Sequence, residues 1–242
     1  MLAAGKGTRM RSRRAKVLHE VCGRPMAYYP VRRALEAGAS PVVVVVGHQG
    51  DEVREALRRH LPDAPLRFAR QREQRGTAHA VLAARPALRG FTGSVLILSG
   101  DAPLLTAHTL EAVMQARAGS PALAFATMTL ENPEGYGRVV HAPLGGPALV
   151  VEEKDATPEE RQIKEVNAGL YCADAGFLWA TLGEVERRNA QREFYLTDLV
   201  ALAAEGPGAV AAKVPSVEAM GVNDQEELSL AARALVRRVA LA

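Results

Sequence analysis

PVVVVVGHQG, residues 41–50, contains five consecutive valines at Val42–Val46, and this run is the strongest indication of the fold class. A strand that is apolar on both faces is typical of a parallel sheet covered by helices on both sides. Similar apolar runs occur at residues 95–98 and 123–128. Amphipathic stretches separate these runs, so the chain alternates between strand and helix patterns.

The segments between the apolar runs carry helix signals. We expect helices at residues 25–36, 51–61, 77–84 and 106–116, the last with Thr106 as its N-cap. Because each lies between strands, right-handed crossovers into a parallel, doubly wound sheet are the natural topology. Ligands bind such sheets at the carboxyl ends of the strands.

The pattern changes from about residue 132. GYGRVV and LVVEEK flank the turn-rich segment APLGGPA at residues 142–148, which predicts a two-stranded antiparallel excursion. We further expect a strand at 166–172, a helical region within 194–206, a strand near 209–214 and a final helix from Asp224. The predicted fold is α/β, with a Rossmann-like, doubly wound and mostly parallel sheet and a small antiparallel β extension.

Composition excludes several classes of protein. Of the 242 residues, 48% are apolar and 24% are charged, as in soluble globular domains and unlike disordered chains. The net charge of 30 − 27 = +3 is too small to indicate nucleic-acid or membrane binding by field alone. Cys22 and Cys172 form neither a metal-ligand spacing nor a disulfide framework, which fits a reducing cytoplasm. The longest apolar run is far shorter than the roughly 20 residues that span a bilayer.

LAAGKGTRM, residues 2–10, is the first segment whose residues could bind a ligand. Its two glycines let successive backbone amides point at a phosphate chain, and Lys6 and Arg9 add positive charge. The segment is neither a Walker A loop nor a GxGxxG dinucleotide fingerprint. Taken alone, it is also compatible with an ordinary flexible loop.

Together with KVLHEVCGRPM at residues 16–26, this loop resembles the signature of sugar-phosphate nucleotidyltransferases. The wider match resembles the uridyltransferase domain of the bacterial bifunctional N-acetylglucosamine-1-phosphate uridyltransferases and glucosamine-1-phosphate acetyltransferases, in the nucleotide-diphospho-sugar transferase superfamily. The matching segments, in the family's order, are QREQRGTAHA (71–80), SGDAPLL (99–105), GYGRVV (135–140), VEEKDAT (151–157), QIKEVNAGLY (162–171), EFYLTDLVALA (193–203) and GVND (221–224). They cover nearly the whole chain.

The resemblance implies a magnesium ion held by Asp101 and Asn223, and oxygen ligands of this kind suit a hard cation. Lys16 matches the family lysine that contacts the nucleotide phosphates, and Arg9 is placed to bind the phosphates that leave. From the residue types alone, Asp101 is equally compatible with a turn and Asn223 with a helix N-cap, whereas Lys16 would ordinarily be expected at a solvated position in the basic run at 11–16.

The resemblance also implies two sets of ligand-binding residues. Those for the nucleotide, besides Lys16, are Leu2, Ala3, Ala4, Gly5, Gln71, Gly76, Thr77, Ser99 and Gly100. Those for the sugar are Gly137, Glu152, Asn167 and Asn223, with Tyr195 and Thr197 lining the same pocket. Thr77 is also suited to cap the helix that follows it, and Glu152 to a solvated hairpin face.

The activity implied by the resemblance is transfer of a uridylyl group from UTP to N-acetyl-α-D-glucosamine 1-phosphate. The products are UDP-N-acetylglucosamine, a cell-wall precursor, and pyrophosphate. One alternative is a nucleotidyltransferase for another sugar or base, such as a glucose-1-phosphate thymidylyltransferase or a molybdopterin nucleotidyltransferase; EEKDAT and EVNAG argue against it, because they lie where the sugar is read. The other is a non-catalytic nucleotide-sugar-binding module, against which the retention of Lys16, Asp101 and Asn223 argues.

The chain departs from the family pattern at Ala15, where a proline is common, and at Ser99, where an aromatic residue is common. We expect a nucleotidyltransferase domain at residues 1–222, its first strand truncated because only Met1 to Ala4 precede the glycine loop. Residues 223–242 are expected to form a helix that begins a linker. Hexapeptide repeats of the family's trimerising β-helix are absent from the sequence, so we expect no acetyltransferase activity from this chain and make no prediction of its oligomeric state.

Overall fold

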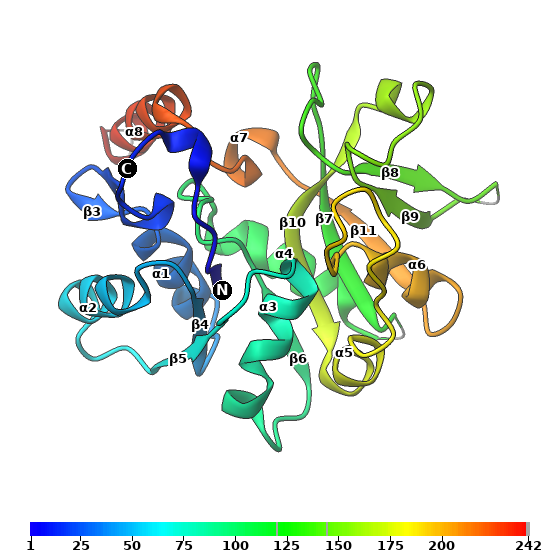
Figure 1. Cartoon of the computed structure of the whole chain (residues 1–242), viewed down its shortest axis with the longest axis horizontal. Helices are drawn as coiled ribbons and strands as arrows, with labels where there is room; N and C mark the ends of the chain where they lie inside the picture. Colours follow the sequence, from blue (N-terminus) through cyan, green and yellow to red (C-terminus); the bar gives the residue numbers. More distant parts are fainter. Residues whose placement is uncertain (120, 144, 241–242) are drawn as a thin grey trace.

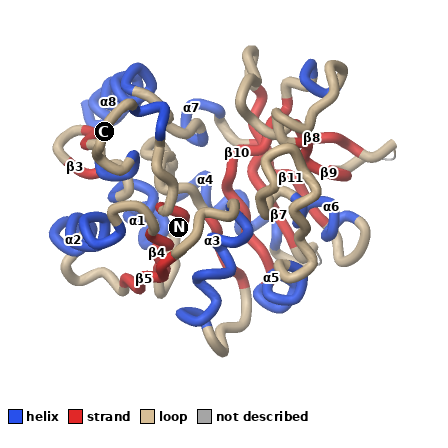
Figure 2. Tube along the Cα trace, in the orientation of Figure 1, coloured by secondary structure: helices blue, strands red, loops and turns tan. Residues whose placement is uncertain are grey.

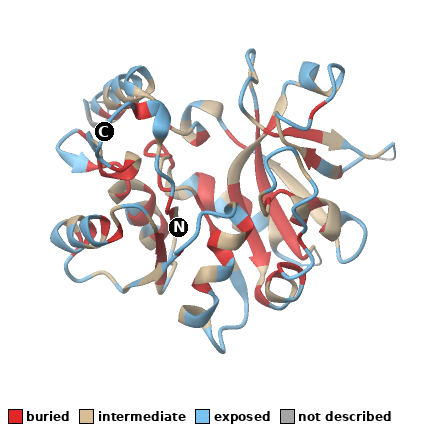
Figure 3. Cartoon of the chain, viewed as in Figure 1, coloured by how far each residue is buried: buried red, intermediate tan, exposed pale blue. Residues whose placement is uncertain are grey.

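A computed structural model of the chain describes residues 1–119, 121–143 and 145–240. Helices pack around twisted sheets in an α/β arrangement, as expected (Figures 1 and 2). Buried residues concentrate on the strands and on the helix faces that cover them (Figure 3). Leu144 of the expected turn and residues 241–242 of the expected final helix lie outside the described residues.

The valine run forms the centre of a parallel sheet. Its strands are β1 (Leu2–Ala3), β4 (Val42–Val46) and β5 (Leu66–Arg70), in the order β1-β4-β5. The even-numbered valines of β4 belong to one apolar cluster with residues of helices α1 (Tyr28–Glu36) and α2 (Gly50–His60). Val43 and Val45 belong to another with residues of α3 (Thr77–Ala84). Helices therefore cover both faces of β4, which explains why the strand is apolar throughout.

A second, mixed sheet holds the remaining long strands. Its order is β11-β7-β10-β8-β9, and β6 also pairs with β10. The bounds are β6 Ser94–Ile97, β7 Leu123–Thr129, β8 Arg138–His141, β9 Pro147–Val151, β10 Glu165–Asp174 and β11 Ala209–Lys213. β10 runs antiparallel to both β6 and β7, whereas β11 is parallel to β7. The expected antiparallel hairpin is present as β8 and β9, and β10 adds an antiparallel strand inside the sheet as well.

Strand β1 joins the two sheets. Leu2 pairs with Val45 of β4 on one side and forms a bridge with Ser99 on the other. The backbone nitrogen of Leu2 donates to the Leu98 carbonyl at 2.8 Å, and the Gly100 nitrogen donates to the Leu2 carbonyl at 2.8 Å. The loops that follow β1, β4, β5 and β6 therefore reach the same edge of the molecule.

Helix signals in the sequence are confirmed closely. α3 has the expected bounds, and α4 (Ala107–Arg117) is capped by Thr106, whose side chain accepts from the Thr109 nitrogen at 3.1 Å. α6 (Asp198–Ala204) and α8 (Gln225–Ala240) lie in the expected C-terminal regions. The expectations lacked β5, the hairpin of β2 (Glu20–Val21) and β3 (Arg24–Pro25), and the short helices α5 (Ala175–Thr181) and α7 (Ser216–Ala219). These elements are short or weakly patterned, so tertiary contacts decide them.

The C-terminal helix α8 packs on the N-terminal half of the chain. Ala231 and Leu235 share a buried cluster with Val21 and Met26, and α8 and the β2–β3 hairpin lie in the same corner of Figure 1. The helix therefore completes a hydrophobic cluster with residues far away in the sequence. The domain boundary at residue 222 stays a prediction.

The first strand, β1, comprises Leu2 and Ala3. Met1 lies at a groove of about 320 Å³ whose lining includes β4 and β6 residues. The Met1 carbonyl accepts from the Val45 nitrogen at 2.9 Å, so the backbone pairing with β4 begins at this residue.

Among the described residues, no helix combines the length and the apolar character that crossing a membrane requires.

Candidate functional site

A cleft of about 430 Å³ opens at the carboxyl ends of β1, β5 and β6. Twelve of the predicted site residues line it: Leu2, Ala3, Ala4, Gly5, Arg9, Lys16, Gln71, Gly76, Thr77, Ser99, Asp101 and Asn223. Gly100 lies behind the lining, where a Cβ would be 3.0 Å from the Leu2 carbonyl oxygen. The cleft therefore lies at the carboxyl ends of the strands, where the alternation of strands and helices in the sequence predicts a ligand site.

A cluster of charged and amide groups occupies one end of the cleft. The Lys16 ammonium forms an ion pair with Asp101 and donates to Asn223 Oδ1 at 3.1 Å. Arg9 Nη2 donates to the same Asn223 oxygen at 2.8 Å. The side chains of Lys16 and Asp101 are only 14% and 22% exposed, so their charges are partly shielded from water. Residues more than 200 positions apart thus meet at one point.

Gly7 allows this meeting. Its φ is 66°, and a Cβ there would lie 2.4 Å from the Lys16 Cβ. Any other residue would displace the lysine or strain the loop. The second glycine of GKG is therefore required by close approach to Lys16.

Asp101 and Asn223 present oxygen atoms to one point, because both contact the same Lys16 nitrogen. Asp224, not Asn223, caps α8: its Oδ1 accepts from the Glu227 nitrogen at 2.9 Å. The Asn223 amide is therefore available to the cleft. Within the described residues, no group of three or more His, Cys, Asp or Glu side chains could hold a metal. A cation here would take a carboxylate and an amide oxygen, leaving room for phosphate and water.

The predicted base-reading residues surround the start of α3. Gln71 is buried, and its Nε2 donates to the Gly76 carbonyl at 3.1 Å. Gly76 has φ 112°, and a Cβ there would lie 2.4 Å from the Phe194 carbonyl oxygen. Gly76 is the N-cap, while the Thr77 hydroxyl accepts from the Leu196 nitrogen at 2.9 Å instead of capping its own helix. Thr77 thus ties α3 to residues 194–197.

Sequence reasoning missed Gln74. Its Nε2 donates to the Ala4 carbonyl at 2.6 Å, and it lines the cleft together with Glu193. The signal was present, because Gln74 is the second glutamine of the QxxQxGT segment. Its contact holds the glycine loop against the segment that contains Gln71.

Gly137, Glu152 and Asn167 gather in the second sheet and do not line the cleft itself: Gly137 directly precedes β8, Glu152 directly follows β9 and Asn167 lies in β10. The Asn167 nitrogen donates to the Gly137 carbonyl at 2.9 Å, and a Cβ on Gly137 would be 3.4 Å from Glu152 Oε2. The Thr197 hydroxyl donates to Glu152 Oε1 at 2.9 Å. The group borders the cleft near Ser99, whose Oγ would lie 3.6 Å from a Cβ on Gly169 of the same strand as Asn167.

Residues 1–170 match the family model of the MobA-like NTP transferase domain. The chain belongs to this family. It is 66% identical over 98% of its length to a protein named "Bifunctional protein GlmU" from Anaeromyxobacter sp. (strain Fw109-5), covering 49% of that protein. It is 50% identical over 99% of its length to the protein of the same name from Pelobacter propionicus, covering 52% of it. The chain spans about half the length of these curated relatives.

The hairpin of this MobA-like NTP transferase domain approaches the charged cluster through Tyr136. Burial raises the pKa of the Tyr136 hydroxyl, and the carboxylates of Glu227 and Asp101 raise it further. Arg9 acts in the opposite direction. Tyr136 therefore lies near the Lys16 cluster, and the next residue, Gly137, belongs to the predicted sugar group.

Acidic groups gather around the predicted sugar residues. Burial raises the pKa of Glu152, although the hydrogen bond from Thr197 opposes the shift. Burial, with the nearby Asp155 carboxylate, raises the pKa of Asp198 to about 6. The hydroxyl of Tyr195 accepts from Gln191 Nε2 at 2.9 Å, and burial raises its pKa to about 12.

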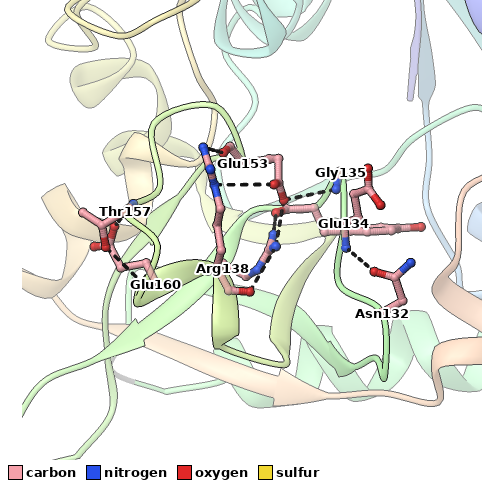
Figure 4. A network of polar contacts seen from close by, with 9 residues as sticks. Asn132, Glu134, Gly135, Arg138, Glu153, Thr157 and Glu160 are labelled. Atoms are coloured by element: carbon pink, nitrogen blue, oxygen red, sulfur yellow. Dashed lines mark hydrogen bonds and ion pairs between the residues drawn. The ribbon is translucent and has the colours of Figure 1, made fainter.

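Arg138 and Glu153 anchor the loop that carries Gly137 (Figure 4). Arg138 is 2% exposed and pairs with Glu153 at 2.7 Å. Glu153 also accepts from the Gly135 nitrogen at 3.2 Å, and Arg138 donates to the Tyr136 carbonyl. Sequence reasoning passed over this pair, although both residues lie in segments that carry the family resemblance. The contacts fix the loop on both sides of Gly137.

Proposed function

We propose that this MobA-like NTP transferase domain transfers a uridylyl group from UTP to N-acetyl-α-D-glucosamine 1-phosphate. The products are UDP-N-acetylglucosamine and pyrophosphate. The observation that carries the proposal is the convergence of Lys16, Arg9, Asp101 and Asn223 in the cleft at the ends of β1 and β6. Relatives named for GlmU, at 65–66% identity over nearly the whole chain, support the same activity.

In this mechanism a phosphate oxygen of the sugar phosphate attacks the α-phosphorus of UTP, and the bond to the β-phosphate oxygen breaks. The attacking phosphate is already ionised at neutral pH, so the reaction needs no general base. Catalysis then resides in alignment and in neutralisation of charge. The Lys16 ammonium would leave Asp101 to contact the α-phosphate, and the Arg9 guanidinium would bind the departing pyrophosphate.

A divalent cation belongs to this proposal, with Mg²⁺ as its identity. Asp101 and Asn223 would hold it, because their oxygens meet in the cleft and suit a hard cation. When bound, the ion would neutralise phosphate charge. Charge neutralisation by metal ions is general among enzymes that transfer from nucleoside triphosphates.

The division of ligand binding follows the two groups of residues. Gln71, Gly76 and Thr77 would read the uracil base, with the backbone of residues 2–5 beneath it and Ser99 and Gly100 beside it. Gly137, Glu152 and Asn167 would bind the sugar, with Tyr195 and Thr197 beside them and Asn223 at the junction with the phosphates. Residues 1–222 would form the catalytic domain. A cytoplasmic location is part of the proposal and fits the two free cysteines, Cys22 and Cys172.

Pyrophosphate release, measured across a panel of nucleoside triphosphates and sugar 1-phosphates, tests the proposal. UTP with N-acetylglucosamine 1-phosphate should give the highest kcat/KM. A preference for another base or sugar would overturn the assignment in favour of a different nucleotidyltransferase. Binding of UDP-N-acetylglucosamine without turnover of any pair would indicate a non-catalytic module.

Paired variants test how base and sugar reading are divided. Gln71→Ala should relax discrimination among nucleotides and leave sugar preference unchanged, whereas Glu152→Ala should weaken use of the sugar phosphate and leave nucleotide preference unchanged. A site that hydrogen-bonds one group rejects analogues lacking it, because its own polar atoms are left unpaired. The two effects should be nearly additive, since the residues contact different ligands. An unchanged sugar phosphate KM in Glu152→Ala would remove that residue from the sugar pocket.

A further inference from the structure

The side chains of Asn167 and Tyr171 meet in a place where a regular strand would keep them apart. They are four residues apart on β10, and in an extended strand that spacing corresponds to about 13 Å. In the structure, Asn167 Nδ2 donates to the Tyr171 hydroxyl at 2.7 Å. The register of β10 against β7 shifts between these two residues, and Gly169 within the irregularity has φ 71°. A bulge of this kind re-aims side chains.

The Asn167 amide has a fixed orientation. The Gly169 nitrogen donates to Asn167 Oδ1 at 3.1 Å, two residues along, as in an Asx turn. A backbone N–H can only donate, so the atom facing it must be the oxygen, and the atom facing Tyr171 must be the nitrogen. The amide nitrogen carries two hydrogens, and the Tyr171 oxygen accepts one of them. The other is available to an acceptor on a ligand.

Tyr171 is itself rigidly held. It is 3% exposed, and its ring stacks on Phe125 at a centroid distance of 6.3 Å. Burial and the Glu152 carboxylate raise the pKa of its hydroxyl, so the group stays neutral throughout the physiological range. Its acidic neighbours are Glu152 of the predicted sugar site and Asp198. A neutral, buried hydroxyl in the core thus supports a half-buried amide at the edge of the site.

We propose that Tyr171 is a positioning residue for the sugar 1-phosphate, holding the Asn167 amide so that one Nδ2 hydrogen points to an acceptor oxygen of that ligand. The inference rests on the proposed function, which assigns Asn167 to the sugar. It adds that the ligand group opposite Asn167 is a phosphate or hydroxyl oxygen acting as acceptor, not a donor. Tyr171 contacts the amide and not the ligand.

Tyr171→Phe removes only the hydroxyl and keeps the stacked ring. We expect KM for N-acetylglucosamine 1-phosphate to rise about three- to tenfold, in line with the loss of one hydrogen bond, with kcat and the UTP KM within about twofold. Tyr29→Phe is the matched control, because it removes another hydrogen-bonded hydroxyl, the one that donates to the Val21 carbonyl. It should leave the sugar phosphate KM unchanged. A general loss of packing would instead lower Tm and affect both substrates.

A double-mutant cycle with Asn167→Ala distinguishes the positioning role of Tyr171 from the proposed sugar-binding role of Asn167. If Tyr171 acts through the amide, Tyr171→Phe should have no further effect in the Asn167→Ala background. A raised KM in Asn167→Ala with a wild-type KM in Tyr171→Phe would overturn the positioning role and leave the sugar site in place. No effect of Asn167→Ala on the sugar phosphate KM would overturn both the positioning role of Tyr171 and the assignment of Asn167 to the sugar. NMR of the Asn167 side-chain amide gives a second readout, since its two hydrogens should become more alike in shift and faster in exchange in Tyr171→Phe.

Discussion

Lys16 contacts both oxygen atoms of the candidate metal site. Its ammonium pairs with Asp101 and donates to Asn223. Under the proposed function, phosphate binding would move this charge to the nucleotide and release both oxygens for a cation. One side chain would then serve both the metal ligands and the phosphates.

Lys16→Ala should lower kcat more than it weakens UTP binding, because phosphate charge is greatest during transfer. We expect kcat to fall about 100-fold and the UTP KM to change less than about threefold. Steady-state kinetics with pyrophosphate detection measures both, and Lys213→Ala, which removes an exposed lysine, is the control. A rise in the UTP KM alone would make Lys16 a ground-state anchor.

Asp101→Ala should abolish nearly all turnover, since the cation loses its charged ligand, and Asn223→Ala should be milder. Titration of Mn²⁺ in the presence of a UTP analogue, followed by paramagnetic relaxation, should show weaker metal binding in the same order. Equal activity of wild type and Asp101→Ala at limiting Mg²⁺ would remove Asp101 from the site. Chelation of the metal should abolish turnover by the wild-type protein in the same assay.

Asp198→Asn should stabilise the protein at alkaline pH. Burial and the Asp155 carboxylate raise the pKa of Asp198 from 3.8 to about 6, so the folded state binds this proton more tightly than the unfolded chain. The ionised group therefore destabilises the fold above pH 6, and the penalty disappears as the pH falls to about 4. We expect a gain of about 1–2 kcal/mol at pH 8 and none at pH 4, from urea unfolding. A pH-independent difference would contradict this origin.

At the scale of elements, α3 depends on a glycine at its N-cap. Gly76 has φ 112°, and the Phe194 backbone passes so close that a Cβ would lie 2.4 Å from its carbonyl oxygen. Thr77 binds the same segment through the Leu196 nitrogen. One turn therefore joins the part of the cleft that contains Gln71 to residues 194–197, which reach Glu152 through Thr197.

Gly76→Ala should destabilise the fold by about 2–4 kcal/mol, because the residue is strained and its Cβ meets backbone. Gly90→Ala is a matched control: its φ is 76°, and a Cβ there would have no atom within 4 Å. Gly90→Ala should lower the free energy of unfolding by only about 1 kcal/mol, because its sole cost is the positive φ. Urea denaturation of both variants measures the difference, and equal losses would show that the contact with Phe194 does not matter.

At the scale of the whole molecule, the two sheets meet at a strand of two residues. β1 pairs with β4 and bridges to Ser99, while the groove beyond Met1 presents apolar side chains from β4, β6 and the adjoining helices. β1 therefore connects the two sheets through backbone hydrogen bonds on both of its edges.

Local sequence patterns were enough to predict which segments are buried on both faces, where the main helices begin, and which residues are candidates for the site. Five consecutive valines specify a covered strand, Thr106 specifies a helix start, and the order of the motifs points to Lys16, Asp101 and Asn223. These signals are local, because side-chain periodicity, capping and glycine conformations act over a few residues.

Which elements are neighbours could be seen only in the folded chain. β10 runs antiparallel between β6 and β7, the Arg138–Glu153 pair anchors the hairpin loop, and a bulge brings Tyr171 to Asn167. A strand's pattern specifies which face is buried but not which edge it pairs with. Pairing between distant segments depends on how all the apolar faces are covered at once, so the supporting contacts of the site appear only when the whole chain is folded.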